Sequence, residues 1–359
     1  MVDLFAGPGG LDVAAHWLGL TVEGVEWDED ACRTRKAARL ATVPGDVRDF
    51  GPNNFPDAEF KILAGGPPCQ TFTVAGSGAG RRALDDVVDF AKRMASGNED
   101  PDRIKEDLKS LDDERTGLVL EPLRWALEAH RQGRPYDAIV LEQVPAVLPV
   151  WKAFEAALGE IGYEADSDIL HTEEFGVPQT RRRAILIARR DGKPSLPSST
   201  HRRYRKGVPR SSGDSGLRAW ETMGRALEGR GQFTVISNYG TGGDPKARGQ
   251  RTSEEPAFTV TGKISRNRLR SPSGEELERF EDKEAGRLQT FPADYPWDGN
   301  AIAQQIGNAI PPRLAAHVLA AAIGWSLKPE SESKKVDAAV DAPWAVTRDS
   351  SPLLPLVTD

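Results

Sequence analysis

Short apolar runs alternate with segments of helical periodicity over the first half of the chain. The runs have strand length and lie at residues 2–5, 21–26, 61–64, 138–142 and 183–188, while residues 11–18 and 118–130 repeat apolar positions with a helical period. Near-continuous apolar runs are typical of strands buried on both faces, so we expect these strands to be parallel. Their alternation with helices predicts an α/β protein with a Rossmann-like, doubly wound sheet.

The second half of the chain changes character. Residues 191–284 are richer in Pro, Gly, Ser and Arg, with short β-like pieces at 233–237 and 257–261, which predicts a smaller strand-and-loop domain after a catalytic domain at 1–190. Helical periodicity returns at 275–289 and 315–327, and we expect residues 285–327 to complete the first domain. Residues 85–111 are acidic and weakly periodic, which indicates a surface insertion, and 328–359 are expected to be a disordered tail.

Composition narrows the class of protein. The chain is 38% hydrophobic with a mean hydropathy of −0.48, and no apolar run approaches the roughly 18 residues of a membrane helix, so we expect a cytoplasmic protein without membrane contact. Two cysteines, Cys32 and Cys69, do not make a disulfide framework. The five histidines show no metal-ligand spacing, and no metal is expected.

The net charge of −7 hides a basic region. Residues 181–270 contain 21 Lys and Arg against 7 Asp and Glu. Such a concentration is typical of a phosphate-binding surface, although a solvated loop region would look the same from charge alone.

Three expected strand ends carry residues suited to an adenosine ligand. After the first strand comes Phe5-Ala6-Gly7-Pro8-Gly9, a glycine-rich turn that leads into a helix, where backbone N–H groups can approach a ligand. Glu26 and Trp27 end the second strand, where a carboxylate can accept from ribose hydroxyls and an indole can stack on adenine. Asp46 follows the third element and could accept from the adenine amino group.

The stretch Gly65-Gly66-Pro67-Pro68-Cys69-Gln70 is the most informative of the chain. A strand runs into two glycines and two prolines, so the thiol follows a rigid turn at the edge of the sheet instead of lying within an apolar run. This placement favours a reactive cysteine over a structural one. The small residues that follow predict a mobile lid, on which Arg81 and Arg82 could meet phosphates.

Together these motifs resemble the cytosine-C5 DNA methyltransferase family of bacteria and phages. The glycine turn and Pro-Pro-Cys-Gln carry the resemblance, and further family motifs follow in order at 141–144 (Leu-Glu-Gln-Val), 179–183 (Gln-Thr-Arg-Arg-Arg), 287–292 (Arg-Leu-Gln-Thr-Phe-Pro) and 305–312 (Gln-Ile-Gly-Asn-Ala-Ile-Pro-Pro). The resemblance spans residues 1 to about 326. It implies the fold of S-adenosylmethionine-dependent methyltransferases, with a target-recognition domain at 191–284.

The resemblance also implies roles for individual residues. Cys69 would add to C6 of a flipped cytosine, Glu142 would contact N3 and the amino group, and Arg183, supported by Arg181, would lie near O2. S-adenosylmethionine would be the methyl donor, S-adenosylhomocysteine the product, and the pocket residues would be Phe5, Gly7, Gly9, Glu26, Trp27, Asp46, Pro68 and Asn308. Double-stranded DNA would be bound by Gln70, Arg81, Arg82, Gln179, Thr259, Lys263, Arg266 and Arg268, with base-reading loops around 246–251 and 263–270.

Some points stay open at this stage. Gln143 replaces the Asn of the family's Glu-Asn-Val motif, and the acidic segment 85–111 has no role in the family pattern. The main alternative is a tRNA cytosine-C5 methyltransferase on the same scaffold. A protein with an inactive site and a C5 alkyltransferase with a modified donor are weaker alternatives. We further expect a monomer associated with the nucleoid, with a restriction endonuclease as a possible partner.

Overall fold

A computed structural model describes residues 1–68, 78–97, 103–104, 107, 117–238 and 248–349, with side chains left out at 78–83. Cys69 and Gln70 therefore lie outside the described residues, as do the side chains of Arg81 and Arg82. No helix in the described part of the chain is long and apolar enough to cross a membrane.

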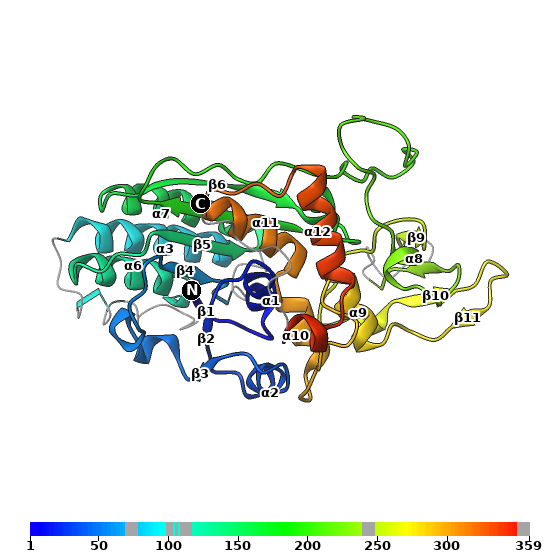
Figure 1. The fold of residues 1–359 in the computed structure, drawn as a ribbon, viewed down its shortest axis with the longest axis horizontal. Helices are drawn as coiled ribbons and strands as arrows, with labels where there is room; N and C mark the ends of the chain where they lie inside the picture. The colour runs from blue at the N-terminus through cyan, green and yellow to red at the C-terminus, as the bar shows by residue number, and fades with distance from the viewer. Residues whose placement is uncertain (69–77, 98–102, 105–106, 108–116, 239–247, 350–359) are drawn as a thin grey trace.

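One large sheet organises the first half of the molecule (Figure 1). Its seven strands follow the order β3-β2-β1-β4-β5-β7-β6, and their bounds are β1 Val2–Leu4, β2 Glu23–Glu26, β3 Thr42–Pro44, β4 Ile62–Gly65, β5 Ala138–Gln143, β6 Glu164–His171 and β7 Arg182–Arg189. The order confirms the predicted doubly wound α/β fold, in which the chain reverses direction across the sheet beside β1 and β4.

The last strand of this sheet corrects one expectation. The run at 183–188 was expected to be parallel, but β7 is antiparallel to both β5 and β6. The connection from β6 to β7 contains only the 3-10 turn η5 (Thr172–Phe175) and a short loop, which is too short for a parallel crossover. β6 was not predicted, because this edge strand is largely half-exposed and lacks an apolar run.

Helices cover both faces of the sheet. On one face pack α3 (Gly78–Ser96), α6 (Glu121–Arg131) and α7 (Leu148–Gly159), and on the other α1 (Gly10–Trp17) and α11 (Pro312–Ala322), as Figure 1 shows. The expected insertion at 85–111 is partly wrong, since Val87, Phe90 and Ala91 of α3 are buried in the core. The many aspartates of this segment hid the apolar face that covers the sheet.

A second sheet forms the core of the smaller part of the molecule. Its order is β11-β10-β8-β9, all antiparallel, with β8 Thr234–Ile236, β9 Gln250–Thr252, β10 Arg268–Arg270 and β11 Glu276–Leu277. The expected strand at 257–261 is absent from this fully described segment, which instead runs along residues 179–181. The expected helix at 275–289 begins as β11 and becomes helical only at α9 (Asp282–Leu288).

The remaining helices lie in both parts of the molecule. They are α2 (Glu29–Ala37), α8 (Met223–Ala226), α10 (Ile302–Asn308), α12 (Glu330–Asp341) and α13 (Trp344–Thr347), and short 3-10 turns include η1 (Val47–Asp49) and η2 (Pro52–Asn54). The helical periodicity expected to last until residue 327 ends earlier, with α11 at Ala322.

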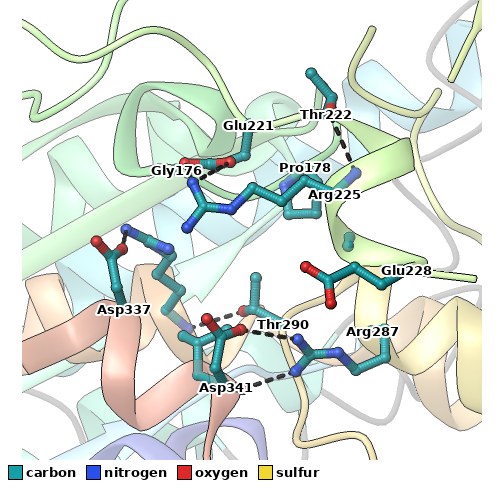
Figure 2. Close-up of a pocket in the computed structure, with 13 residues that line it drawn as sticks. Gly176, Pro178, Glu221, Thr222, Arg225, Glu228, Arg287, Thr290, Asp337 and Asp341 are labelled. Atoms are coloured by element: carbon teal, nitrogen blue, oxygen red, sulfur yellow. Dashed lines mark hydrogen bonds and ion pairs between the residues drawn. The ribbon is translucent and has the colours of Figure 1, made fainter. Parts of the chain in front are cut away.

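The expected disordered tail is wrong for residues 328–349, because α12 and α13 pack onto the rest of the protein. Val336, Ala339 and Val340 form a buried stripe on α12, and Trp344 is 2% exposed. Figure 2 shows Asp337 and Asp341 of α12 beside a small pocket, with Arg287 bound to Asp341. Asp337 forms ion pairs with Arg218 and Arg313. The Glu, Ser and Lys residues of this segment had suggested disorder, because they surround an apolar stripe of only three residues.

Candidate active site

A cavity of about 480 Å³ opens at the carboxyl ends of the central strands. Its walls come from the glycine turn after β1, the ends of β2, β4 and β5, the start of β7, and α10. Of the predicted site residues, it is lined by Phe5, Gly7, Glu26, Trp27, Pro68, Glu142, Arg183 and Asn308. Residues far apart in the sequence thus meet where a doubly wound sheet binds its ligand.

The glycine turn has the backbone conformation that its composition predicts. Phe5 and Gly7 have φ of 59° and 54°, and Gly9 has φ of 102°. A Cβ on Gly7 would meet nothing within 4 Å, so the space in front of it is open, whereas a Cβ on Gly9 would come within 2.3 Å of Leu40 Cδ1. Gly9 does not line the cavity, and its requirement for glycine comes from packing and from its left-handed conformation.

Glu26 is buried at the mouth of the turn and accepts three backbone hydrogen bonds. Its Oε2 accepts from Gly7 N at 2.7 Å, and its Oε1 accepts from Trp27 N at 2.9 Å and Asp28 N at 2.8 Å. Burial raises the pKa of Glu26, while these N–H donors pull it back toward the ionised form. The Trp27 side chain beside it is 70% exposed, which leaves its ring free to stack on a flat ligand.

Asp46 does not line this cavity. Its carboxylate caps η1 and forms an ion pair with Arg48 at 2.6 Å. Burial opposes its ionisation, but the hydrogen bonds and charge of Arg48 prevail and lower the pKa of Asp46. The predicted adenine contact therefore has its carboxylate engaged by a neighbour in this structure.

Asp3 is a cavity residue to which the sequence assigned no role. It is 1% exposed, and neither carboxylate oxygen has a hydrogen-bond partner among the described residues. Burial, followed by the nearby charge of Asp12, holds the pKa of Asp3 well above the ordinary value, although Arg35, which pairs with Asp12 at 2.8 Å, acts in the opposite direction. Asp3 stands first in the motif Asp-Leu-Phe-Ala-Gly, and a polar residue in an otherwise apolar strand was the available signal.

Glu142 and Arg183 form the polar centre of the cavity. Glu142 lies near the end of β5, Arg183 near the start of β7, and Arg183 Nε is 2.6 Å from Glu142 Oε1. Both side chains are largely buried, at 7% and 12% exposed. A carboxyl group and a guanidinium are thus held side by side in a cavity that Pro68, the residue that precedes Cys69, also lines.

Gln143 ties the end of β5 to the proline turn. Its Nε2 donates to the carbonyl oxygen of Pro67, and its Oε1 accepts from Val144 N at 2.5 Å. The side chain is buried and also lines the cavity. The longer amide therefore has a structural function here, which is to fix the backbone two residues before Cys69.

Two residues of the Gln-Thr-Arg-Arg-Arg motif, Gln179 and Arg181, are held by hydrogen bonds inside the protein. Gln179 is fully buried and bonded to Leu288 O, Gln289 Oε1 and Val260 N, so it does not face DNA in this structure.

Arg181 is 2% exposed and donates to the carbonyl oxygens of Val260 (2.9 Å), Gly307 (2.9 Å) and Ala309 (3.3 Å). Burial and the charge of Arg183 hold its pKa well below the ordinary value. Arg181 lies outside the cavity lining, and it joins β7 to α10 and to the second part of the molecule.

The described DNA-binding candidates of the smaller part are at the surface. Lys263 and Arg266 are exposed, Thr259 is exposed with its hydroxyl donating to Thr180 O, and Arg268 pairs with Glu276 at 2.6 Å. Arg251, in an expected base-reading loop, is instead stacked between Tyr204 and Phe258 at 4.8 and 4.4 Å. No cluster of His, Cys, Asp or Glu suited to a metal ion occurs among the described residues.

The sheet order and the cavity define the class of S-adenosylmethionine-dependent methyltransferases. Solved structures agree: a putative DNA modification methyltransferase from an Escherichia coli prophage matches with a TM-score of 0.54 at 19% identity over 90% of this chain and 98% of that one. The S. pombe Dnmt2 methyltransferase matches with a TM-score of 0.57 at 15% identity over 90% and 97%. At these identities the likeness concerns the fold alone.

The chain belongs to the C-5 cytosine-specific DNA methylase family, whose model matches residues 1–88, 108–213 and 220–324. Curated relatives include the type II methyltransferase M.NgoFVII of Neisseria gonorrhoeae, 25% identical over 87% of this chain and 83% of the relative. M.Sau96I of Staphylococcus aureus is 26% identical over 88% and 74%, and M1.HphI of Haemophilus parahaemolyticus is 25% identical over 90% and 86%. The protein is therefore a DNA (cytosine-5-)-methyltransferase.

Proposed function

We propose that the protein methylates C5 of a cytosine flipped out of duplex DNA, through a covalent bond between Cys69 Sγ and C6 of the base. The observation that carries the proposal is the Glu142–Arg183 pair, 2.6 Å apart in a cavity bordered by Pro68. This pair offers a carboxyl group and a cation to one edge of a planar base, in the cavity that is also lined by the residue preceding Cys69.

The proposed steps follow from cytosine chemistry. Attack of the Cys69 thiolate on C6 moves electrons onto N3 and O2, where a proton held by Glu142 and the charge of Arg183 stabilise them. The resulting enamine makes C5 nucleophilic toward the methyl carbon that the donor would supply, and the electron pair of the broken S–CH3 bond would stay on the sulfur of S-adenosylhomocysteine. A base then removes the C5 proton, and the electrons of that C–H bond re-form the ring double bond as Cys69 leaves.

The cavity residues fit S-adenosylmethionine, which when bound supplies an electrophilic methyl group. The open backbone at Gly7 and the exposed Trp27 ring suit a nucleoside, and the buried Glu26 carboxylate suits its ribose hydroxyls. The unpartnered carboxyl group of Asp3 suits the ammonium group of the methionine portion. Asn308 borders the same space and accepts from Gln304 Nε2 at 3.0 Å.

Duplex DNA is the proposed macromolecular substrate. A stacked cytosine is inaccessible to a buried pair such as Glu142 and Arg183, so the base must leave the helix. Thr259, Lys263 and Arg266 are proposed to contact the DNA, together with Gln70, Arg81 and Arg82. We further propose a monomer that acts on chromosomal DNA in the cytoplasm. Because the relatives are named type II methyltransferases, we also propose a cognate restriction endonuclease as its partner.

A duplex with 5-fluorocytosine at the target position tests the mechanism. Fluorine cannot leave C5 as the proton does, so the adduct persists and the protein stays covalently linked to DNA under denaturing conditions. We expect this adduct with the wild type and with Cys32→Ser, and neither adduct nor methylation with Cys69→Ala. Target duplexes are found beforehand by mapping 5-methylcytosine in host DNA.

Methylation by Cys69→Ala would overturn the mechanism while leaving the family assignment intact. A parallel assay on tRNA distinguishes the substrates, since methylation of tRNA in preference to duplex DNA would overturn the proposed substrate.

A further inference from the structure

A closed loop of basic composition projects from the smaller part of the molecule. Residues 201–210, here called the basic arm, contain Arg202, Arg203, Arg205, Lys206 and Arg210 and no acidic residue, and the rest of the loop up to Arg218 contains one, Asp214. The arm is the green loop at the upper right of Figure 1. On a chain with a net charge of −7, this is a strong local concentration of positive charge.

The base of the arm is fixed. His201 and Arg218 form a bridge, with Arg202 N donating to Arg218 O at 2.7 Å and Arg218 N donating to Thr200 O at 3.0 Å. Arg202 closes the loop further, donating from Nη1 to the carbonyl oxygens of Ser211 and Ser212 at 3.1 Å. The loop is therefore anchored at both ends, in the manner of a compact Ω-loop.

The cations of the arm face solvent without acidic partners. Arg203, Arg205, Lys206 and Arg210 are exposed, and within the described part of the chain none of the five basic side chains forms an ion pair. By contrast, Arg218 at the base pairs with Asp337. Unpaired cations held together on an anchored loop repel one another, and a polyanion relieves this cost.

The arm lies beside a segment that is proposed to contact the DNA through Thr259. Tyr204 of the arm packs on Arg251, whose guanidinium also lies over Phe258, the neighbour of Thr259. Arg251 Nη1 donates to Ala257 O at 2.7 Å and to Thr180 Oγ1 at 2.8 Å, and Thr259 Oγ1 donates to Thr180 O at 2.8 Å. A continuous set of contacts thus leads from Tyr204 to Thr259.

A second line of charge leads from the arm to the catalytic arginine. Arg203 and Arg182 both lower the pKa of His171, after burial, so both cations lie near this residue at the end of β6. Arg182 adjoins Arg183 on β7, opposite His171. Arg203 of the arm is therefore close to the end of β6 and to the start of β7, which borders the cavity through Arg183.

We propose that the basic arm binds the phosphate backbone of the DNA duplex beside the target site. The partner is double-stranded DNA outside the recognised sequence, held by charge and not by base contacts. This inference rests on the proposed action on duplex DNA. An acidic protein partner would use the same charges, but the contacts from Tyr204 to Thr259 favour the nucleic acid that occupies the target site.

The test compares two charge-matched double variants in DNA binding. Arg205→Gln with Lys206→Gln removes two exposed arm cations that have no hydrogen bond within the described structure. Arg131→Gln with Lys193→Gln removes one Arg and one Lys at the opposite edge of the sheet, where α6 ends and where β7 ends. Affinity for a duplex that extends well beyond the target is measured against salt concentration.

We expect the arm variant to reduce the slope of log K against log salt by about 2, since each lost phosphate contact contributes roughly 0.9. The control should keep the wild-type slope, and on a duplex trimmed to the target the arm variant should bind like the wild type. The arm variant should also keep the wild-type kcat and target sequence. An unchanged slope on the long duplex would overturn the proposal, even if the arm is then found to bind an acidic protein. A normal 5-fluorocytosine adduct in the arm variant would show that the catalytic proposal still stands.

Discussion

The arginines of the catalytic core and those of the basic arm use the same side chain in opposite ways. Arg35, Arg181 and Arg313 are at most 5% exposed, and each donates to groups within the protein. Arg203, Arg205 and Arg210 are exposed, and no carboxylate pairs with them in the described part of the chain. The guanidinium groups in the core hold segments together. On the arm, Arg210 Nε donates to Trp220 O at 3.0 Å, and the exposed Arg203 and Arg205 are the ones available for phosphate.

The comparison is sharpest within a single motif. Arg181 and Arg183 are two residues apart, yet Arg181 joins three backbone carbonyls away from the cavity, while Arg183 faces Glu142 inside it. Substituting lysine at each position retains a charge but loses the planar fork of donors. The two substitutions should therefore produce different kinds of defect.

The largest effect is expected from Arg183→Lys. A lysine ammonium cannot hold both Glu142 and O2 of the base in the same plane, so stabilisation of the developing charge is lost. We expect kcat to fall by about 10²–10³, with the free energy of unfolding nearly unchanged. Single-turnover methylation and urea denaturation measure the two quantities, and a kcat within twofold of the wild type would remove Arg183 from the chemistry.

Arg181→Lys should give a smaller effect of another kind. One ammonium cannot satisfy the carbonyls of Val260, Gly307 and Ala309, so the free energy of unfolding should fall by about 2 kcal/mol. The folded fraction should retain its kcat, because Arg181 is absent from the cavity lining. If this variant instead lost kcat at unchanged stability, the division between the two arginines would be wrong.

This division also shows how much of the site the sequence could predict. Strand ends with Gly7, Glu26 and Glu142 follow from local pattern, because parallel strands bring their carboxyl ends to one edge. Whether Arg181 or Gln179 is buried depends on the return of residues 257–260 and 305–309, which no local pattern encodes. The family motif identified these residues as important without indicating that they connect the two parts of the molecule.

The fold shows the same limit. Apolar runs predicted the central strands, but edge strand β6 and helix α12 are only partly buried, so composition concealed them. α12 is held by its buried apolar stripe and by the ion pairs of Asp337 and Asp341 with Arg218, Arg313 and Arg287 from distant segments. Such pairings are tertiary, and a single sequence does not contain their geometry.

The smallest effect is expected for the pH dependence of stability, through the buried carboxyl group of Glu173. Glu173 in η5 is 3% exposed, and burial raises its pKa to about 7 although Arg203 and Arg251 act in the opposite direction. The solvated arm charge is too weak to offset desolvation. The folded state thus binds a proton that the unfolded state releases near the ordinary value of 4.5.

Stability should therefore decrease as pH rises from about 4.5 to about 7, because between these values the folded state holds more protons than the unfolded state. Glu173→Gln removes this dependence, so from about pH 5 to about pH 8 the variant should gain about 1–2 kcal/mol relative to the wild type. Urea denaturation at both pH values measures the change. Arg203→Gln serves as a control and should keep the wild-type dependence, since burial and not the arm sets the proton affinity of Glu173. A parallel pH dependence of Glu173→Gln and wild type would show instead that Glu173 is ionised in the folded protein, and that the arm charges extend their influence into the core.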